Sequence, residues 1–119
     1  AWVRTPPLLP LYEDTLKDIV TQTFEVSEEI KDNRDLNDIL NATMQELGEL
    51  ATEISIQKGY RKAPVGKDGI VGEAIDTIVC LLDIIHVYDP TITKETIEEI
   101  AGKKLANRFS DATKSRSQD

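Results

Sequence analysis

Residues 69–89, GIVGEAIDTIVCLLDIIHVYD, form the most apolar segment of the chain, yet the segment carries Glu73, Asp76 and Asp83. A helix that is apolar on nearly every side is typically surrounded by protein. At about 100° per residue, the three carboxylates fall within roughly 80° of one another on the helix surface. Carboxylates on such a helix lose hydration unless a cation compensates their charge. The segment therefore predicts a buried helix with one acidic stripe.

Three further helices are predicted on either side of this segment. A first helix is expected from about Tyr12 into the twenties, and a second over residues 35–57. A fourth is expected from Thr93 to about Phe109. The second carries an apolar stripe at helical spacing: Leu36, Leu40, Thr43, Leu47, Leu50 and Ile54. No segment alternates with the period of a strand, so the expected fold is all-α with about four helices.

The chain reads as one domain with a short extension at each end. Three prolines in residues 1–11 predict an extended N-terminal arm. Residues 12–109 form the single all-α domain, and the polar residues 110–119 form a flexible tail. The stretch KGYRKAPVGKDG, residues 58–69, contains one proline and three glycines and is expected to be the loop between the second and third helices.

Charge and cysteine content limit the classes of partner and location. The net charge of −8 disfavours a nucleic-acid polymer or an anionic membrane as partner, because both repel an acidic protein. Glu73, Asp76 and Asp83 inside the apolar segment also make its insertion into a bilayer unfavourable. The single cysteine, Cys80, permits no intramolecular disulfide and fits a reducing, cytoplasmic location.

Two pairs of acidic residues stand out as candidate metal ligands. Acidic pairs at i, i+3 occur seven times in this chain, so the spacing alone is a weak signal. Glu46 and Glu49 border the apolar stripe of the second helix, and Glu73 and Asp76 lie on the apolar third helix. If these helices pack antiparallel, the four carboxylates can converge on Mg²⁺ or Mn²⁺. The alternative is that these acids line a hydrated groove or a partner interface.

The order of these motifs resembles that of the MazG-like, all-α nucleoside triphosphate pyrophosphohydrolases. QELGEL, a basic loop and GEAIDTIVCLLDII are similar to that family's ExxE, variable gap and ExxD, with 23 residues between Glu49 and Glu73. KLANR is similar to the family's Lys-x-x-Asn-Arg segment, which places Lys104 and Asn107 at the substrate. The resemblance spans about residues 36–108.

The resemblance implies an enzyme that hydrolyses (deoxy)nucleoside triphosphates to a monophosphate and pyrophosphate. Mg²⁺, for which Mn²⁺ can substitute, would be held by Glu46, Glu49, Glu73 and Asp76. Water would attack the α-phosphorus, and Glu49, Glu46 or Glu53 would act as general base, with Glu49 preferred. The third helix has more apolar surface than about three short helices can cover, which predicts a homo-oligomer, a dimer or tetramer, that completes the helical bundle. The resemblance implies the same, with sites partly lined by residues of neighbouring subunits.

The residues around these motifs are open to two interpretations. Lys58, Arg61, Lys62 and Lys67 form either a phosphate-attracting rim over the carboxylates or a solubilising loop. Asp83 lies two turns beyond Asp76 and is interpreted either as a residue that supports the metal ligands or as a helix-contact residue, rather than as a ligand itself.

Two other functions fit the same pattern. One is a non-catalytic, oligomeric helical interaction module with an acidic face. The other is a hydrolase of another phosphorylated small molecule on the same metal frame. Turnover of a nucleotide panel distinguishes these functions.

Overall fold

The computed structural model describes residues 18–66 and 68–118, with side chains as far as residue 114. These residues form four helices and no strand: α2 Ile19–Glu29, α3 Leu36–Gln57, α4 Gly69–Tyr88 and α5 Lys94–Gln118. The all-α prediction is therefore confirmed. The expected arm over residues 1–11, the start of the first helix and Lys67 lie outside the described residues.

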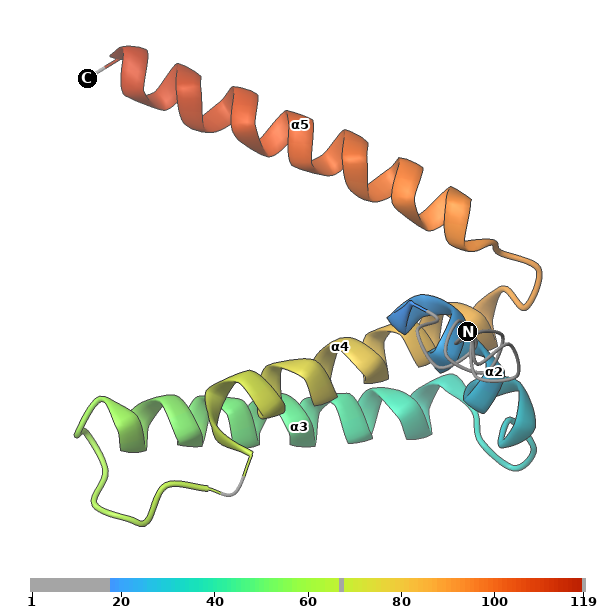
Figure 1. The fold of residues 1–119 in the computed structure, drawn as a ribbon, viewed down its shortest axis with the longest axis horizontal. Helices are drawn as coiled ribbons and strands as arrows, with labels where there is room; N and C mark the ends of the chain where they lie inside the picture. Colours follow the sequence, from blue (N-terminus) through green and yellow to red (C-terminus); the bar gives the residue numbers. More distant parts are fainter. Residues whose placement is uncertain (1–17, 67, 119) are drawn as a thin grey trace, which may run out of the picture.

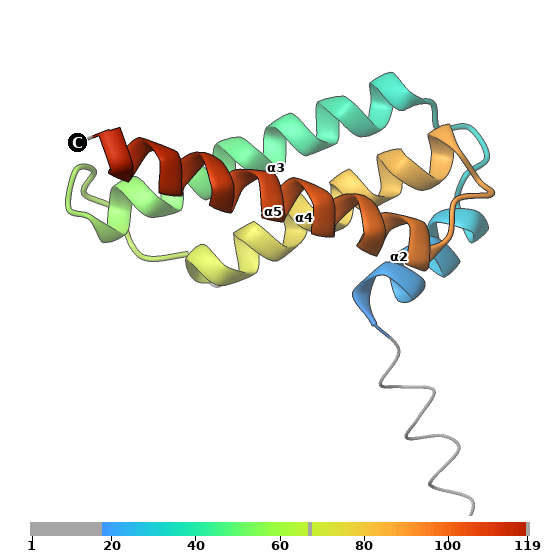
Figure 2. The ribbon, with the colours of Figure 1, turned by 90° about the horizontal axis from the view of Figure 1, so that it is seen from above.

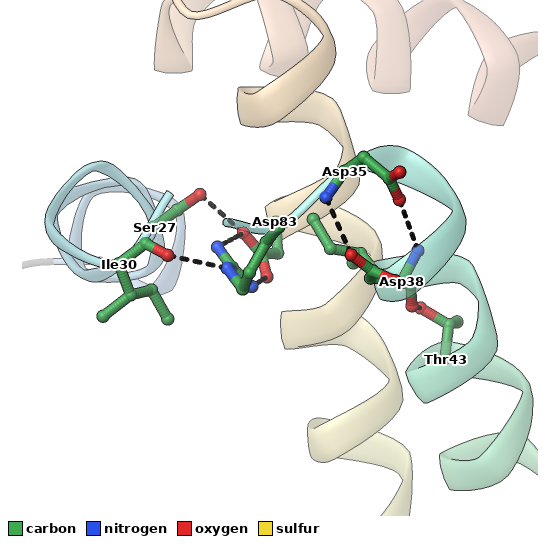
Figure 3. Close-up of polar contacts among 8 residues, drawn as sticks. Ser27, Ile30, Asp35, Asp38, Thr43 and Asp83 are labelled. Carbon is green, nitrogen blue, oxygen red and sulfur yellow. Dashed lines mark hydrogen bonds and ion pairs between the residues drawn. The ribbon is translucent and has the colours of Figure 1, made fainter. Parts of the chain in front are cut away.

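Side-chain caps explain where three of the helices begin. Asp18 accepts a hydrogen bond from the backbone N–H of Thr21 at the start of α2. Asp35 and Asp38 form a reciprocal capping box at α3, which Figure 3 shows. Thr93 accepts from the N–H of Thr96 at the start of α5.

The fourth helix start has no such cap. Asp68 precedes α4, but its side chain makes no capping hydrogen bond. Its carboxylate is therefore available to its neighbours on the first turns of α4.

Helices α3 and α4 lie side by side and antiparallel, with the 58–68 loop joining them at one end (Figures 1 and 2). Small polar residues allow the two backbones to approach, because Thr43 and Thr77 are both buried. Each hydroxyl donates to the carbonyl four residues earlier, at 2.7 Å for Thr43 and 3.0 Å for Thr77. Ile39 and Leu82 are the buried apolar side chains of the described chain. The antiparallel arrangement that a shared metal site requires is thus present.

Helix α2 packs against the C-terminal half of α4 through a buried polar contact (Figure 3). Asp83 accepts hydrogen bonds from Ser27 Oγ and from both terminal nitrogens of Arg34, at 2.6 and 3.0 Å. Burial alone would raise the pKa of Asp83, but the hydrogen bonds from Arg34 and Ser27 outweigh burial and lower it. Asp83 is a helix-contact residue, which is one of the two roles that its position in the sequence predicts.

A second contact closes the same interface. His86 is buried on α4, with Nε2 2.9 Å from Glu28 Oε1 and its ring 4.9 Å from the ring of Phe24. These partners belong to α2. His86 therefore helps to hold α2 against α4.

Helix α5 leaves this three-helix unit and runs back above it, well separated in Figure 1. A turn precedes it, in which Asp89 Oδ1 accepts hydrogen bonds from the N–H and hydroxyl of Thr91 at 3.1 and 2.7 Å. Lys94 Nζ lies 3.4 Å from Asp18 Oδ2 and ties the start of α5 to α2. The helix continues to Gln118, beyond the predicted end near Phe109, and side chains 98–114 are all exposed.

Large apolar side chains remain exposed on every described helix. Leu47 on α3 is 53% exposed, Ile78 on α4 is 43% exposed and Phe109 on α5 is 74% exposed. The apolar stripe of the second predicted helix, α3, was expected to face the core. It is only partly covered, because α3 has one close helical neighbour. None of the described helices has both the length and the hydropathy needed to cross a bilayer.

Candidate metal centre

Helices α3 and α4 bring two overlapping groups of carboxylates together. One oxygen each from Glu46, Glu49 and Glu73 lies within 4.8 Å of the others. Asp68, Glu73 and Asp76 form a second group with the same spacing, and Glu73 is common to both. All four predicted ligands therefore belong to these groups. The second group adds Asp68, a fifth acid that was not among the predicted ligands.

Two oxygens of this cluster are buried without a hydrogen-bond partner among the described residues. They are Glu46 Oε2 and Glu73 Oε2. Burial is the largest cause that raises the pKa of Glu46, followed by the charge of Glu49. The pKa of Glu73 is raised in the same way, by burial first and then by the charges of Glu49 and Asp76. Ionising this cluster without a cation is therefore unfavourable.

The effect of the cluster extends to the single cysteine. Cys80 is half-buried on α4, one turn beyond Asp76. Burial raises the pKa of its thiol, and the charge of Glu46 raises it further. The raised pKa disfavours the thiolate form of Cys80 beside the site.

An open hollow of about 530 Å³ adjoins the carboxylates. It is lined by Gln45, Gly48, Glu49, Thr52, Glu53 and Glu73. Five of these residues come from two successive turns of α3, and Glu73 comes from the first turns of α4. Hard oxygen ligands beside an open volume fit Mg²⁺ or Mn²⁺ with room for a ligand of the cation.

Glu53 lies in the same hollow but has different surroundings. Its carboxylate accepts from the backbone N–H of Gly66, 3.0 Å from each oxygen, and from Gln57 Nε2 at 3.1 Å. The side chain is buried. Glu53 is one of the three possible general bases predicted from the sequence. Its partner Gly66 lies 13 residues away in an irregular loop, so no periodic pattern could reveal this contact.

The basic loop begins at the end of α3. Lys58, the C-cap residue of α3, is the first residue of the loop, and the N–H groups of Tyr60 and Arg61 donate to the carbonyl of Ser55 at 2.8 and 3.3 Å. Lys58, Arg61 and Lys62 are exposed and form no ion pair within the described part of the chain. These cations are thus free to meet an anionic ligand.

Lys104 and Asn107 lie elsewhere. With Arg108 and Asp111 they line a separate hollow on α5. No residue of α3 or α4 contributes to that hollow. A single chain therefore holds the carboxylates and the Lys-x-x-Asn-Arg segment in two different places.

Comparison of the chain with protein-family models, with curated proteins and with solved structures gave no match in any of the three.

Proposed function

We propose that the protein is a Mg²⁺-dependent nucleoside triphosphate pyrophosphohydrolase of the MazG-like type. The observation that carries this proposal is the convergence of Glu46, Glu49 and Glu73, two of whose oxygens are buried with no hydrogen-bond partner in the described part of the chain. An all-α fold with antiparallel motif helices is in keeping with the resemblance of the sequence to that family.

The four acids share one task in this proposal, and Glu49 has a second. Glu46, Glu49, Glu73 and Asp76 would hold the cation, which would neutralise triphosphate charge and polarise the α-phosphate. Glu49 is the exposed member of its group and lines the hollow. It is therefore the residue best placed to accept the proton of the attacking water as pyrophosphate leaves.

A second copy of the chain is part of the proposal. The apolar side chains of α5 and the uncovered faces of α3 and α4 are supporting observations, since isolated chains rarely expose so much apolar surface. A neighbouring α5 would cover those faces and bring Lys104 and Asn107 to the carboxylates of its partner. Lys58, Arg61 and Lys62 would contact phosphate from the loop.

The decisive experiment is a panel of canonical and modified NTPs and dNTPs with Mg²⁺, in which pyrophosphate and monophosphate are both measured. We expect turnover that falls at least about a hundredfold in Glu73→Gln. Glu29→Gln is the matched control, because Glu29 is exposed on α2 and distant in sequence from the cluster. No turnover of any nucleotide would refute the proposal, and release of orthophosphate would place the protein in another reaction class.

The exposed apolar faces also support a second candidate, a non-catalytic oligomeric helical module. It predicts stable assembly without nucleotide turnover and without dependence on Mg²⁺. A hydrolase of another phosphorylated small molecule would bind Mg²⁺ at the same acids but hydrolyse none of the nucleotides.

A further inference from the structure

Glu53 lines the hollow, but its carboxylate oxygens already have hydrogen-bond partners within the protein. Glu53 is 5% exposed, and its two oxygens accept from Gly66 and Gln57 at 3.0–3.1 Å. By contrast, Glu46 Oε2 and Glu73 Oε2 have no partner among the described residues. A metal ligand needs lone pairs that point at the metal. Glu53 instead accepts one N–H from the loop, shared by both oxygens, and one from Gln57 on α3.

The contact depends on the absence of a side chain at residue 66. A Cβ built on Gly66 would lie 2.7 Å from Glu53 Oε2, which is closer than such contacts allow. Only glycine lets the backbone N–H approach both oxygens of the buried carboxylate. Any larger residue must displace either the loop or the carboxylate.

The loop is thereby fastened to α3 at two points. Its first turn is held by the N–H groups of Tyr60 and Arg61 on the Ser55 carbonyl. Its far end is held by Gly66 on Glu53, which itself lines the hollow beside Glu49 and Glu73. The residues between these points include Arg61 and Lys62, both exposed and without an ion-pair partner among the described residues.

We propose that Glu53 is a positioning residue that latches the basic loop at the rim of the hollow, where Arg61 and Lys62 meet the phosphates of the substrate. It is neither a metal ligand nor the general base. The identity of the substrate rests on the proposed function, whereas the attachment of the loop rests on the Glu53–Gly66 contact alone. The choice of general base then narrows to Glu46 and Glu49.

The first test measures the attachment without any substrate. Limited trypsin digestion, followed by mass spectrometry, gives the rate of cleavage after Arg61 and Lys62, with cleavage after Lys103 as internal reference. We expect cleavage in the loop to accelerate roughly tenfold or more in Glu53→Ala and Gly66→Ala, because buried charge-assisted hydrogen bonds are lost. Glu53→Gln keeps one acceptor oxygen and should fall between these variants and the wild type. Glu29→Gln should not differ from the wild type.

The second test separates a latch from a metal ligand. Mn²⁺ affinity, measured by calorimetry, should stay within about twofold of wild type in both Glu53→Ala and Gly66→Ala. Nucleotide KM should rise in both, while kcat changes little, because phosphate binding is lost and the carboxylates are intact. A purely structural defect would lower kcat and thermal stability as well, and would not be relieved in Glu53→Gln.

Two results would overturn the inference. The first is unchanged cleavage of the loop in Glu53→Ala. The second is loss of Mn²⁺ affinity in Glu53→Ala but not in Gly66→Ala, which would make Glu53 a ligand. If the wild type hydrolyses no nucleotide, the proposed function fails, and the digestion experiment still decides whether the latch exists.

Discussion

At the scale of single residues, Glu73 carries an unfavourable charge that a cation should relieve. Its pKa is raised, so the folded protein binds a proton there more readily than the unfolded chain does. The contribution of Glu73 to stability is therefore present at low pH and is lost as the pH rises through the folded-state pKa. We expect Glu73→Gln to raise the melting temperature of the metal-free protein at pH 7. It should also abolish the further rise that Mn²⁺ gives the wild type. Thermal melts with and without MnCl₂ test both effects, and equal Mn²⁺ stabilisation of the two proteins would contradict this.

The pKa shift of Asp83 is opposite to that of Glu73, because the pKa of Asp83 is lowered. Its stabilising contribution is present above the ordinary carboxyl pKa and is lost as the pH falls through the lower, folded-state value. We expect Arg34→Met to cost about 1–3 kcal/mol at pH 7, because a largely buried carboxylate loses its partner. Urea unfolding should show a smaller cost at pH 3. Lys31→Met removes an exposed ion pair with Glu28 and should cost under about 1 kcal/mol.

The same residues show what the sequence could and could not predict. The acidic stripe separates candidate ligands from Asp83 by position alone, and that distinction agrees with the contacts of Asp83. Its partner Arg34 lies in the charged segment between α2 and α3, 49 residues away. Residue spacing within one helix cannot predict a contact over that sequence separation. Asp68 as a member of the site and Gly66 as the partner of Glu53 were missed for the same reason, since irregular segments bring these residues to their neighbours.

At the scale of the elements, the contact between α3 and α4 sets the spacing of the carboxylates. Thr43 is buried at this contact one turn before Glu46. We expect Thr43→Leu to cost about 1–3 kcal/mol by overpacking. It should also weaken Mn²⁺ binding by roughly tenfold, because the helices move apart. Thr43→Val keeps the volume and should leave Mn²⁺ affinity unchanged. Calorimetry on the two variants distinguishes spacing from a general loss of stability, and equal affinities in both would contradict this.

The helix boundaries were largely predictable, because capping residues and breakers mark them locally. The end of α5 was not. Phe109 is the last large apolar residue, so the periodic signal stops there, but no proline or glycine follows it to stop helix propagation. Hydrophobic periodicity shows which residues of a helix can pack. It marks the end of the helix only where the packed part and the helix end at the same residue.

At the scale of the whole molecule, the proposed assembly predicts that inactive subunits complement one another. Glu73→Gln and Lys104→Ala should each be inactive alone. Co-refolded dimers should recover about a quarter of wild-type activity, since half of them are mixed and each mixed dimer has one intact site. Mixing Glu73→Gln with Glu46→Gln is the control and should recover nothing, because both lesions lie on the same side of the site. Failure of the first pair to complement would mean that Lys104 does not act on a partner.

The sequence predicts surplus apolar surface on the third helix, and exposed Ile75, Ile78 and Leu81 agree with this. It could not predict how the α3 stripe divides between core and surface, because periodicity gives the apolar direction of a helix without saying how many neighbours fill it.

The short turn before α5 determines the direction in which this long helix runs. Asp89 and Thr91 fix this turn, and at 1.5 Å per residue Lys104 lies about 15 Å along the helix from Lys94. A change of about 10° at the turn would move the Lys104 backbone by about 3 Å, more than a hydrogen bond can absorb. In the proposed assembly, the position of Lys104 at a partner's carboxylates would thus depend on Asp89 and Thr91. Substitutions in the Asp89–Pro90–Thr91 turn should therefore change the direction of α5 and displace Lys104, without removing any residue that contacts the site.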